Sequence, residues 1–310
     1  MNIFVSGSLA YDRIMNFPGR FSDHILPDKI HILNVCFTVN GMAEKFGGTA
    51  GNIAYSLRLL EERPAILATI GKDHHNYIKR LKELDLTLEG IKVIENEFTA
   101  GAYITTDLSD NQITGFNPGA MQYKSEYSFG DSVSADSIAI MSPGNLEDMK
   151  EYARQYKKLG IRCICDPGQS LTAWDAESLK EWISGSTMLI TNDYELELIM
   201  KILTMNKEDL LTITKTVITT LGEKGSVVAD SAGETLIPAA KITQVVDPTG
   251  AGDAYRAGLI KGLCLARSVI DSARIASVAA VYAVEHYGTQ EHSYTFDEFR
   301  QRYTGNFGAF

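Results

Sequence analysis

The sequence that decides the fold runs Asp247-Pro248-Thr249-Gly250-Ala251-Gly252-Asp253-Ala254-Tyr255-Arg256-Ala257-Gly258. Proline and glycine end any strand before it, and an apolar run suited to a helix begins at Gly250. The first amides of a helix have no partner within it, and together with the helix dipole they favour an anion such as phosphate. Asp253 would stand beside this place for negative charge. That position suits a base that takes a proton from a hydroxyl about to attack phosphorus.

An ordinary glycine-rich turn with an acid in the first helical turn is the alternative for this stretch. The full string of twelve residues is more specific, because it resembles the C-terminal signature of the ribokinase-like carbohydrate and nucleoside kinases, the PfkB family. The resemblance implies that Asp253 is the catalytic base. It also implies that the amides of Gly250, Ala251 and Gly252 form the anion hole.

The composition fits a globular enzyme with small-molecule partners. The chain has 310 residues, 45% of them apolar, and a net charge of −10, which argues against nucleic acid or an anionic membrane as the main partner. No basic leader precedes an apolar segment at the N-terminus, and no apolar run approaches the roughly 18 residues of a membrane span. Cys163 and Cys165 alternate on an expected strand, which predicts a buried thiol pair and fits a reducing cytoplasm.

Short apolar runs alternate with helical patterns along most of the chain, which predicts an α/β fold with a mostly parallel sheet and helices on both faces. The expected strands lie near 3–5, 66–70, 138–141, 161–165, 188–190 and 217–218, and the expected helices near 49–60, 75–84, 146–159, 194–202, 250–265 and 269–287. Two β-like regions, 13–46 with alternation from Ile30 to Val39 and 98–116, interrupt the rhythm. They are expected either as hairpins on the edge of the main sheet or, by the resemblance, as a small lid within one domain spanning 1–310.

A second glycine-rich entry to a helix, Gly47-Gly48-Thr49-Ala50-Gly51-Asn52, is by itself equally a tight turn. It resembles the N-terminal signature of the same family, which implies that Gly47, Gly48 and Asn52 bind sugar hydroxyls. Asp12 follows the first strand, where a loop carboxylate is expected on the ligand side of the sheet, and the family uses an Asp there to grip a diol. Glu61 departs from the family, which has glycine to close this helix.

Two further motifs point to ATP. Asn192 and Glu195 share one face of a helix start, where an N-cap is the alternative reading. The resemblance implies that they order Mg²⁺ and its waters beside the ATP phosphates, as oxygen ligands suit that ion. The segment from Thr219 to Gly225 is expected as a strand turn, and the family loop at this place contacts nucleotide through residues equivalent to Thr220, Gly222 and Gly225.

The remaining implications concern the substrate and the cations. The segments containing Asn111 and Gln169 resemble the branch that phosphorylates nucleosides, and they imply that Asn111 contacts ATP and Gln169 the substrate. The family also implies a potassium ion near Asp247 and Thr249, and some relatives form homodimers through the lid. A nucleoside base needs a flat apolar slot with an aromatic wall. Aromatic candidates for it are Phe37, Tyr103, Phe116 and Trp174.

These features together predict a cytoplasmic, ATP-dependent kinase of adenosine-kinase type that phosphorylates the 5′-hydroxyl of a nucleoside. A sugar kinase acting on ribose, fructose or a phosphosugar shares all the motifs and is the alternative. A non-catalytic nucleotide sensor on the same fold is the alternative from another class, against which the presence of Asp253 argues. The sequence does not determine the preferred nucleoside, the range of phosphate donors, the oligomeric state or the potassium dependence.

Overall fold

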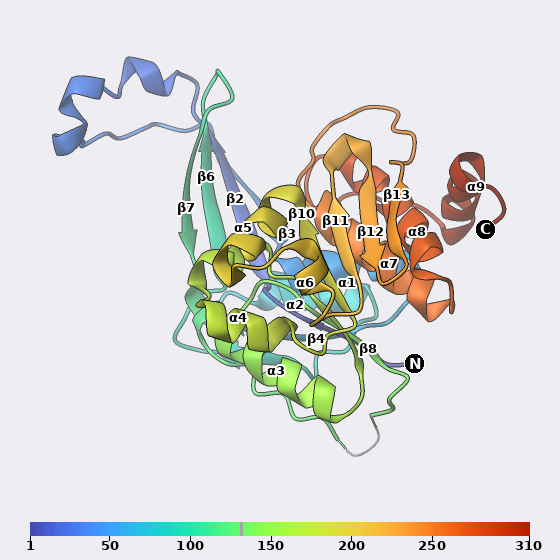
Figure 1. The fold of residues 1–310 in the computed structure, drawn as a ribbon. Helices are drawn as coiled ribbons and strands as arrows, with labels where there is room; N and C mark the ends of the chain where they lie inside the picture. Colours follow the sequence, from blue (N-terminus) through green and yellow to red (C-terminus); the bar gives the residue numbers. More distant parts are fainter. Residues whose placement is uncertain (131–132) are drawn as a thin grey trace.

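The main sheet carries the functional edge of the molecule. In the computed structural model, which describes residues 1–130 and 133–310, nine strands form this sheet in the order β13-β12-β11-β10-β9-β8-β1-β4-β5 (Figure 1). All neighbouring strands are parallel except at β11–β12 and β12–β13, where a meander ends the sheet. The strands are β1 Ile3–Ser6, β4 Ala65–Gly71, β5 Ile91–Ile94, β8 Ile138–Met141, β9 Arg162–Cys165, β10 Met188–Asn192, β11 Val217–Thr220, β12 Ser226–Asp230 and β13 Gly233–Ile237.

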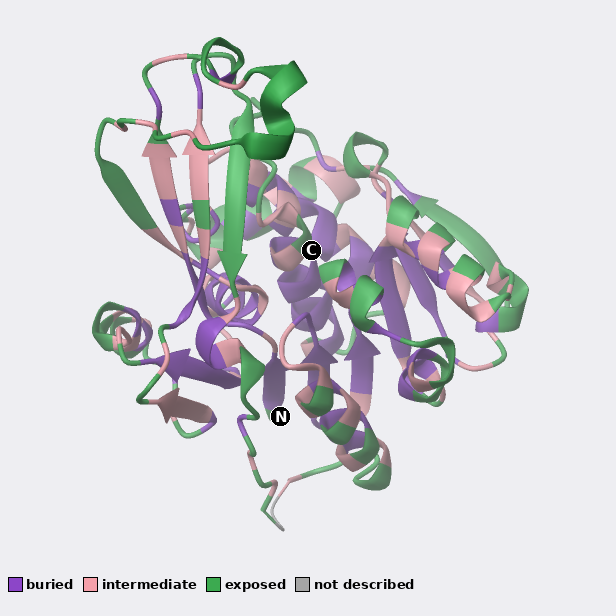
Figure 2. Ribbon diagram, turned by 90° about the vertical axis from the view of Figure 1, so that its left-hand side faces the viewer, coloured by how far each residue is buried: buried purple, intermediate pink, exposed green. Residues whose placement is uncertain are grey.

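Helices cover both faces of this sheet, as the alternation of patterns predicts (Figures 1 and 2). One buried cluster packs α1, α2, α7, α8 and α9 against the sheet, and a second packs α3, α4 and α5 against the other face. Successive residues of β1 enter different clusters, as the period of a strand requires. The helices are α1 Thr49–Leu59, α2 His75–Glu83, α3 Leu146–Lys158, α4 Ala176–Ile183, α5 Asp193–Leu203, α6 Lys207–Leu210, α7 Ala251–Cys264, α8 Val269–Val284 and α9 Phe296–Phe307.

The two β-like regions form a separate lid sheet, so their expected alternative as edge hairpins of the main sheet is wrong. This sheet has the order β3-β2-β6-β7 in the described part of the chain and stands beside the main sheet (Figure 1). Its strands are β2 Ala10–Asn16, β3 Met42–Gly47, β6 Ala100–Thr106 and β7 Gln112–Asn117. Strands β2 and β6 pair in parallel, which joins the two regions despite their distance in sequence.

The segment between β2 and β3 differs from its prediction. The alternation from Ile30 to Val39 favours a strand, yet the chain forms a short 3-10 helix at Pro27–Ile32 and irregular structure after it. Figure 1 shows this arm extending away from the rest of the protein. Ile30 and Ile32 are 63% and 66% exposed there. A strand needs a neighbour to satisfy its backbone groups, and alternation alone cannot supply one.

The carboxyl edge of the main sheet gathers polar groups from distant segments. Asp166 follows β9, Asn192 ends β10 and Thr220 ends β11, and these strands are parallel neighbours. Ligands of open α/β sheets bind outside this edge. The fold therefore brings together motifs that the sequence separates by more than fifty residues.

Candidate active site at the start of α7

A cavity of about 410 Å³ opens at this edge, within the size range of small-molecule sites. It lies between the starts of α7 and α5 and the turns after β9 and β11. Eight of the residues predicted from the sequence line it. They are Gln169, Asn192, Glu195, Thr220, Gly222, Gly250, Gly252 and Asp253.

The start of α7 leaves its amides available to a ligand. Gly250 holds the N-cap in the left-handed region, with φ 80° and ψ −4°, and no side chain caps the helix. A residue with a Cβ is strained there, which explains the glycine. The amide of Ala251 donates to the carbonyl of Pro248 at 3.2 Å, so this predicted anion-hole donor is engaged within the turn. The amides of Gly252 and Asp253 have no hydrogen-bond partner among the described residues.

Asp253 lies in the first turn of α7 and lines the cavity. Withdrawal from water raises the pKa of its carboxyl group to about 7, and the nearby carboxylates of Asp166 and Asp12 act in the same direction. Arg256 and a hydrogen bond from Asn52 oppose that rise. A pKa near neutrality suits a general base.

Arg256 and Asp166 belong to the site, and the segments that contain them resemble the nucleoside-phosphorylating branch, but the sequence does not show that the two side chains pair. Arg256 donates from Nη2 to Asp166 Oδ1 at 2.5 Å and from Nη1 to the carbonyl of Gly252 at 2.9 Å. Both side chains are nearly fully buried, and Asp166 raises the pKa of the guanidinium above its usual value despite burial. A fixed positive charge thus stands beside the amides of α7. The residues are ninety positions apart, and only the fold makes them a pair.

Asn192 and Glu195 line the cavity but also cap α5. The side chain of Asn192 accepts from the amide of Glu195 at 2.7 Å, and the carboxylate of Glu195 accepts from the amide of Asn192 at 2.9 Å. This reciprocal pair is a capping box, so the N-cap alternative is realised in the structure. Burial raises the pKa of the Glu195 carboxyl group.

The other predicted ATP contacts divide between the cavity and elsewhere. Thr220 and Gly222 line it from the expected turn between β11 and β12. Gly225 has φ 94°, and a Cβ there would collide with the carbonyl of Ile237, so backbone packing explains this glycine. Asn111 lies in the turn of the lid hairpin and donates to both oxygens of Asp107. The structure does not bring Gly225 or Asn111 to the cavity, and their contacts with ATP stay predictions.

The predicted sugar-binding residues meet where the lid joins α1. Asp12 lies within β2 rather than in a loop after β1, which corrects its expected position. A Cβ on Gly47 would stand 2.7 Å from Asp12 Oδ2, so the two positions are in contact. Burial raises the pKa of Asp12, with Asp247 contributing. Gly48 forms the N-cap of α1 with φ 87°.

Asn52 has a direct connection to Asp253 that the sequence does not reveal. Its Nδ2 donates to Asp253 Oδ2 at 2.8 Å, and its side chain is buried. The start of α1 therefore contacts the start of α7 through the expected base. This contact connects the two glycine-rich motifs into one site.

The residues expected near potassium lie just before α7. Asp247 Oδ1 accepts from the amide of Thr249 at 2.9 Å, and Oδ2 accepts from the amide of Gly288 at 3.1 Å. No group of three or more His, Cys, Asp or Glu side chains suited to a metal occurs in the described residues. The oxygen-rich lining around Asn192 and Glu195 fits Mg²⁺, which keeps several waters and binds phosphate oxygens as well as one or two carboxylates.

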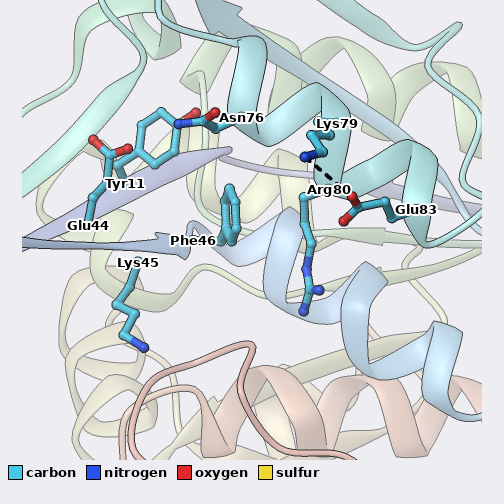
Figure 3. Close-up of a pocket in the computed structure, with 8 residues that line it drawn as sticks. All are labelled: Tyr11, Glu44, Lys45, Phe46, Asn76, Lys79, Arg80 and Glu83. Atoms are coloured by element: carbon cyan, nitrogen blue, oxygen red, sulfur yellow. Dashed lines mark ion pairs between the residues drawn. The ribbon is translucent and has the colours of Figure 1, made fainter.

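A second cavity of about 270 Å³ lies between β3 and α2 (Figure 3). Tyr11, Phe46 and Arg80 are among its lining residues, and Figure 3 shows charged side chains from both elements around it. None of the residues of the predicted phosphoryl-transfer motif lines this cavity. Of the aromatic candidates for a base slot, Trp174 is only 6% exposed and packs on Trp182 in the core, so it is not available.

Comparison with known proteins identifies the family to which the chain belongs. The profile of the pfkB family carbohydrate kinase matches residues 9–295, which is most of the chain. The chain therefore belongs to the pfkB family of carbohydrate kinases, enzymes that transfer a phosphoryl group from ATP. No helix in the described part of the chain is long and apolar enough to cross a membrane.

Similar proteins of this family include nucleoside kinases. The chain is 31% identical over 272 residues to the nucleoside kinase of Methanocaldococcus jannaschii, covering 87% of this chain and 89% of that protein. The crystal structure of the latter superimposes with a TM-score of 0.89 over 99% of both chains. The nucleoside kinase of Burkholderia thailandensis in complex with inosine is 34% identical, with a TM-score of 0.87 and coverage of 99% and 98%. The same protein is also known in complex with ADP-inosine.

Proposed function

We propose that the protein phosphorylates the 5′-hydroxyl of a nucleoside with ATP. The observation that carries this proposal is the first turn of α7, where Asp253 stands beside unpaired amides in one cavity. The relatives named nucleoside kinase, and the complexes of one of them with inosine and ADP-inosine, support the choice of acceptor and donor. An adenosine-like acceptor is the narrower form of this proposal.

Asp253 takes the proton of the attacking hydroxyl. Its pKa of about 7 leaves a large fraction of carboxylate at neutral pH and keeps the group basic enough to accept a proton. The hydroxyl oxygen then attacks the γ-phosphorus in line, and the bond to the leaving phosphate of ADP breaks. The amides of Gly250 and Gly252, and the charge of Arg256, stabilise the equatorial oxygens, and the amide of Ala251 joins them only after it leaves the carbonyl of Pro248. The amide of Asp253 is a further donor, because it has no partner among the residues that the structure describes.

The ribose and the nucleotide occupy the two sides of Asp253. Asp12, Gly47, Gly48 and Asn52 hold the sugar hydroxyls, as the contact of Asp12 with Gly47 and of Asn52 with the base supports. Gln169 is exposed on the cavity wall and contacts the substrate. Thr220 and Gly222 contact ATP from the turn after β11.

Two cations belong to this proposal. Asn192 and Glu195 would hold Mg²⁺ through water, and the ion would supply positive charge to the phosphates of ATP. Asp247 and Thr249 would hold potassium in the turn before α7, where Asp247 supplies a carboxylate. An activity unchanged when a large organic cation replaces K⁺ argues against the potassium site.

Location and assembly complete the proposal. All four cysteines lie in the described part of the chain and carry free thiols, which supports a cytoplasmic enzyme. Exposed Met42, Ile113 and Phe116 on the lid strands support a homodimer through the lid. Equilibrium sedimentation of wild type and of Phe116→Ser tests that assembly, and a monomeric wild type contradicts it.

A coupled ADP-release assay tests the reaction with adenosine, inosine, guanosine, cytidine, ribose, fructose and fructose 6-phosphate. We expect turnover with at least one nucleoside at a kcat/KM at least about tenfold above that for any sugar, a difference of about 1.4 kcal/mol. Turnover confined to ribose or fructose supports the sugar-kinase alternative. An absence of turnover with all seven acceptors supports a sensor instead.

A further inference from the structure

A line of buried polar side chains runs behind the proposed base. Gln290, in the segment between α8 and α9, donates from Nε2 to Asn52 Oδ1 at 3.1 Å and to the hydroxyl of Tyr77 at 3.0 Å. Asn52 in turn donates to Asp253, and the hydroxyl of Tyr77 donates to the carbonyl of Gly47 at 2.7 Å. Gln290, Asn52 and Tyr77 are 3%, 5% and 0% exposed, so water does not compete for these bonds.

The carbonyl of Gly47 fixes the direction of every bond in this line. A carbonyl can only accept, so the hydroxyl of Tyr77 must donate its hydrogen to Gly47. Toward Gln290 the same hydroxyl can then only accept. Gln290 must therefore turn its NH₂ group toward Tyr77, and the second hydrogen of that group reaches Asn52. Asn52 must then present its oxygen to Gln290 and its NH₂ group to Asp253.

The packing around Gln290 leaves little freedom to reverse this order. A Cβ on Gly51 would run into the hydroxyl of Tyr77 and stand 3.1 Å from Gln290 Nε2, so this glycine makes room for the line. The Oε1 atom of Gln290 is buried without a partner among the described residues. An unpaired buried acceptor is costly, and its persistence indicates that the two bonds from Nε2 decide the orientation.

We propose that Gln290 is a positioning residue for catalysis, which orients the amide of Asn52 so that one oxygen of Asp253 is held and the other stays free to accept a proton. This inference adds a positioning residue to the kinase reaction proposed above, and it rests on that proposed function, in which Asp253 is the base. Without Gln290 the amide of Asn52 can rotate and point its oxygen at the carboxylate, an arrangement that favours protonated Asp253. The line also ties the base to Gly47, where the lid strand β3 ends.

Arg80, which Figure 3 shows in the lining of the second cavity, connects that cavity to the backbone of Gln290. Arg80, which lines that cavity, donates from Nη2 to the backbone carbonyl of Gln290 at 3.2 Å. In the same segment, Thr289 donates to the carbonyl of Phe46 at 2.9 Å, and Glu291 pairs with Lys45 at 2.9 Å. These contacts fix the backbone of Gln290 against the lid strand β3. Its side chain is then free to orient the amide of Asn52.

The test is a titration of Asp253 in the intact protein without substrates, followed by ¹³C NMR of labelled aspartate carboxyls. The Asp253 signal is assigned by its loss in Asp253→Asn. The groups that face Asp253 are Arg256 on α7, Asp166 after β9 and Asp12 on β2, and none of them changes in the variants. Gln290→Met keeps the length of the side chain and removes both donors. We expect the apparent pKa of Asp253 to rise by about one pH unit, because a hydrogen bond to the charged form is lost.

Tyr77→Phe serves as a second variant if Gln290→Met does not fold. It removes the acceptor of one Gln290 bond and the donor to the carbonyl of Gly47, keeps the bond from Gln290 to Asn52, and should raise the pKa of Asp253 by less. Tyr55→Phe is the matched control, because its hydroxyl donates to the carbonyl of His292 in the same segment and does not contact the line. We expect it to lower thermal stability and to leave the apparent pKa of Asp253 unchanged.

Turnover separates this proposal from the proposed function. For the best nucleoside, kcat/KM falls at acid pH as Asp253 is protonated. The apparent pKa of that fall should be higher in Gln290→Met than in wild type, by the same amount as in the NMR titration. A folded Gln290→Met protein whose Asp253 titrates as in wild type overturns the positioning role, whatever its activity. A wild-type protein that phosphorylates no nucleoside overturns the proposed function, while the NMR titration still decides the role of Gln290.

Discussion

Two helices begin at the same cavity, and their first turns are built in opposite ways. Helix α5 begins with Asn192 and Glu195, whose side chains satisfy each other's backbone amides. Helix α7 begins with Gly250 and has no side-chain cap, and the amides of Gly252 and Asp253 are free in the described structure. Both starts carry an acidic residue in the first turn.

Because of this difference, the start of α7 rather than that of α5 is ready to bind a phosphoryl group. The capping box of α5 uses its own donors and leaves carboxylate and carbonyl oxygens, which suit a hydrated cation. The start of α7 leaves donors and a positive dipole end, which suit an anion. The same cavity therefore has a donor side at α7 and an acceptor side at α5, matching the transferring phosphate and its metal.

Loss of the base should have the largest effect on rate. In Asp253→Asn the side chain keeps its size and can still accept from Asn52, but it can no longer take a proton. We expect kcat to fall about 10²–10⁴-fold with the dissociation constant for nucleoside nearly unchanged. Steady-state assays and calorimetric binding check this, and a kcat near that of wild type refutes the role of Asp253.

Gly250→Ala should damage the donor side of the cavity directly. Alanine is strained at φ 80°, and its Cβ would stand 3.1 Å from the side chain of Thr289, so the turn must move. Displacing an anion-hole donor typically costs about 10²-fold in kcat, and we expect a loss approaching that size. Urea unfolding should show a smaller loss, of about 1–2 kcal/mol. A destabilised variant with a normal kcat would show that these amides are not used.

The stability of Asp253→Asn relative to wild type should depend on pH. Because burial raises the folded-state pKa of Asp253 to about 7 from 3.8, the native state holds a proton that the unfolded chain has lost between these values. Wild-type stability from this group is present at low pH and is lost as pH rises through 7. Asparagine does not titrate, so between pH 4 and pH 8 the free energy of unfolding of the variant should rise by on the order of 4 kcal/mol relative to wild type. Denaturant titrations at both pH values check the sign.

Removing the cap of α5 should affect stability first. Asn192→Ala should cost about 1 kcal/mol in the free energy of unfolding, and activity should fall as well if the acceptor side holds Mg²⁺. Asn206→Ala is the matched control, because Asn206 caps α6 through the same kind of box and does not line the cavity. If Asn192→Ala and Asn206→Ala lose the same stability and keep the same activity, Asn192 acts only as a helix cap and does not take part in binding Mg²⁺. Glu195→Gln keeps the reciprocal bond and isolates the effect of the charge.

The smallest effect concerns the other end of α1. Glu61 adopts φ 64° after the last turn, and the amide of Glu62 donates to the carbonyl of Leu57, as in a Schellman motif. Glycine fits this conformation without strain, so Glu61→Gly should stabilise the protein by about 0.5–1 kcal/mol and leave turnover unchanged. Thermal denaturation checks this, and a lower melting temperature contradicts it.

Much of the fold is predictable from local pattern. Buried parallel strands are short apolar runs, so β1, β4, β8, β9, β10 and β11 lie where the sequence predicts them. The segment from Ile30 to Val39 does not form the strand that its alternation predicts, because a strand also needs another strand to pair with. Asp12 was expected in a loop for a related reason, since nothing local shows that β2 pairs with β6 ninety residues later.

The site is predictable where one short segment carries it. The motif around Asp253 contains its own glycines, amides and acid, so the sequence alone identifies it. Arg256 with Asp166, and Gln290 with Asn52, depend on contacts between residues 90 and 238 positions apart. Their only local signals are a charged residue one turn after the base and a polar residue following Gly288, and neither names its partner.

We infer that the uncapped start of α7, and not the capped start of α5, holds the transferring phosphoryl group. A crystal structure with ADP, a nucleoside and aluminium fluoride tests it most directly. We predict fluoride atoms within hydrogen-bond distance of the amides of Gly252 and Asp253, and the nucleoside 5′-oxygen beside the carboxylate of Asp253. A fluoroaluminate held at the start of α5, or away from Asp253, would contradict the account.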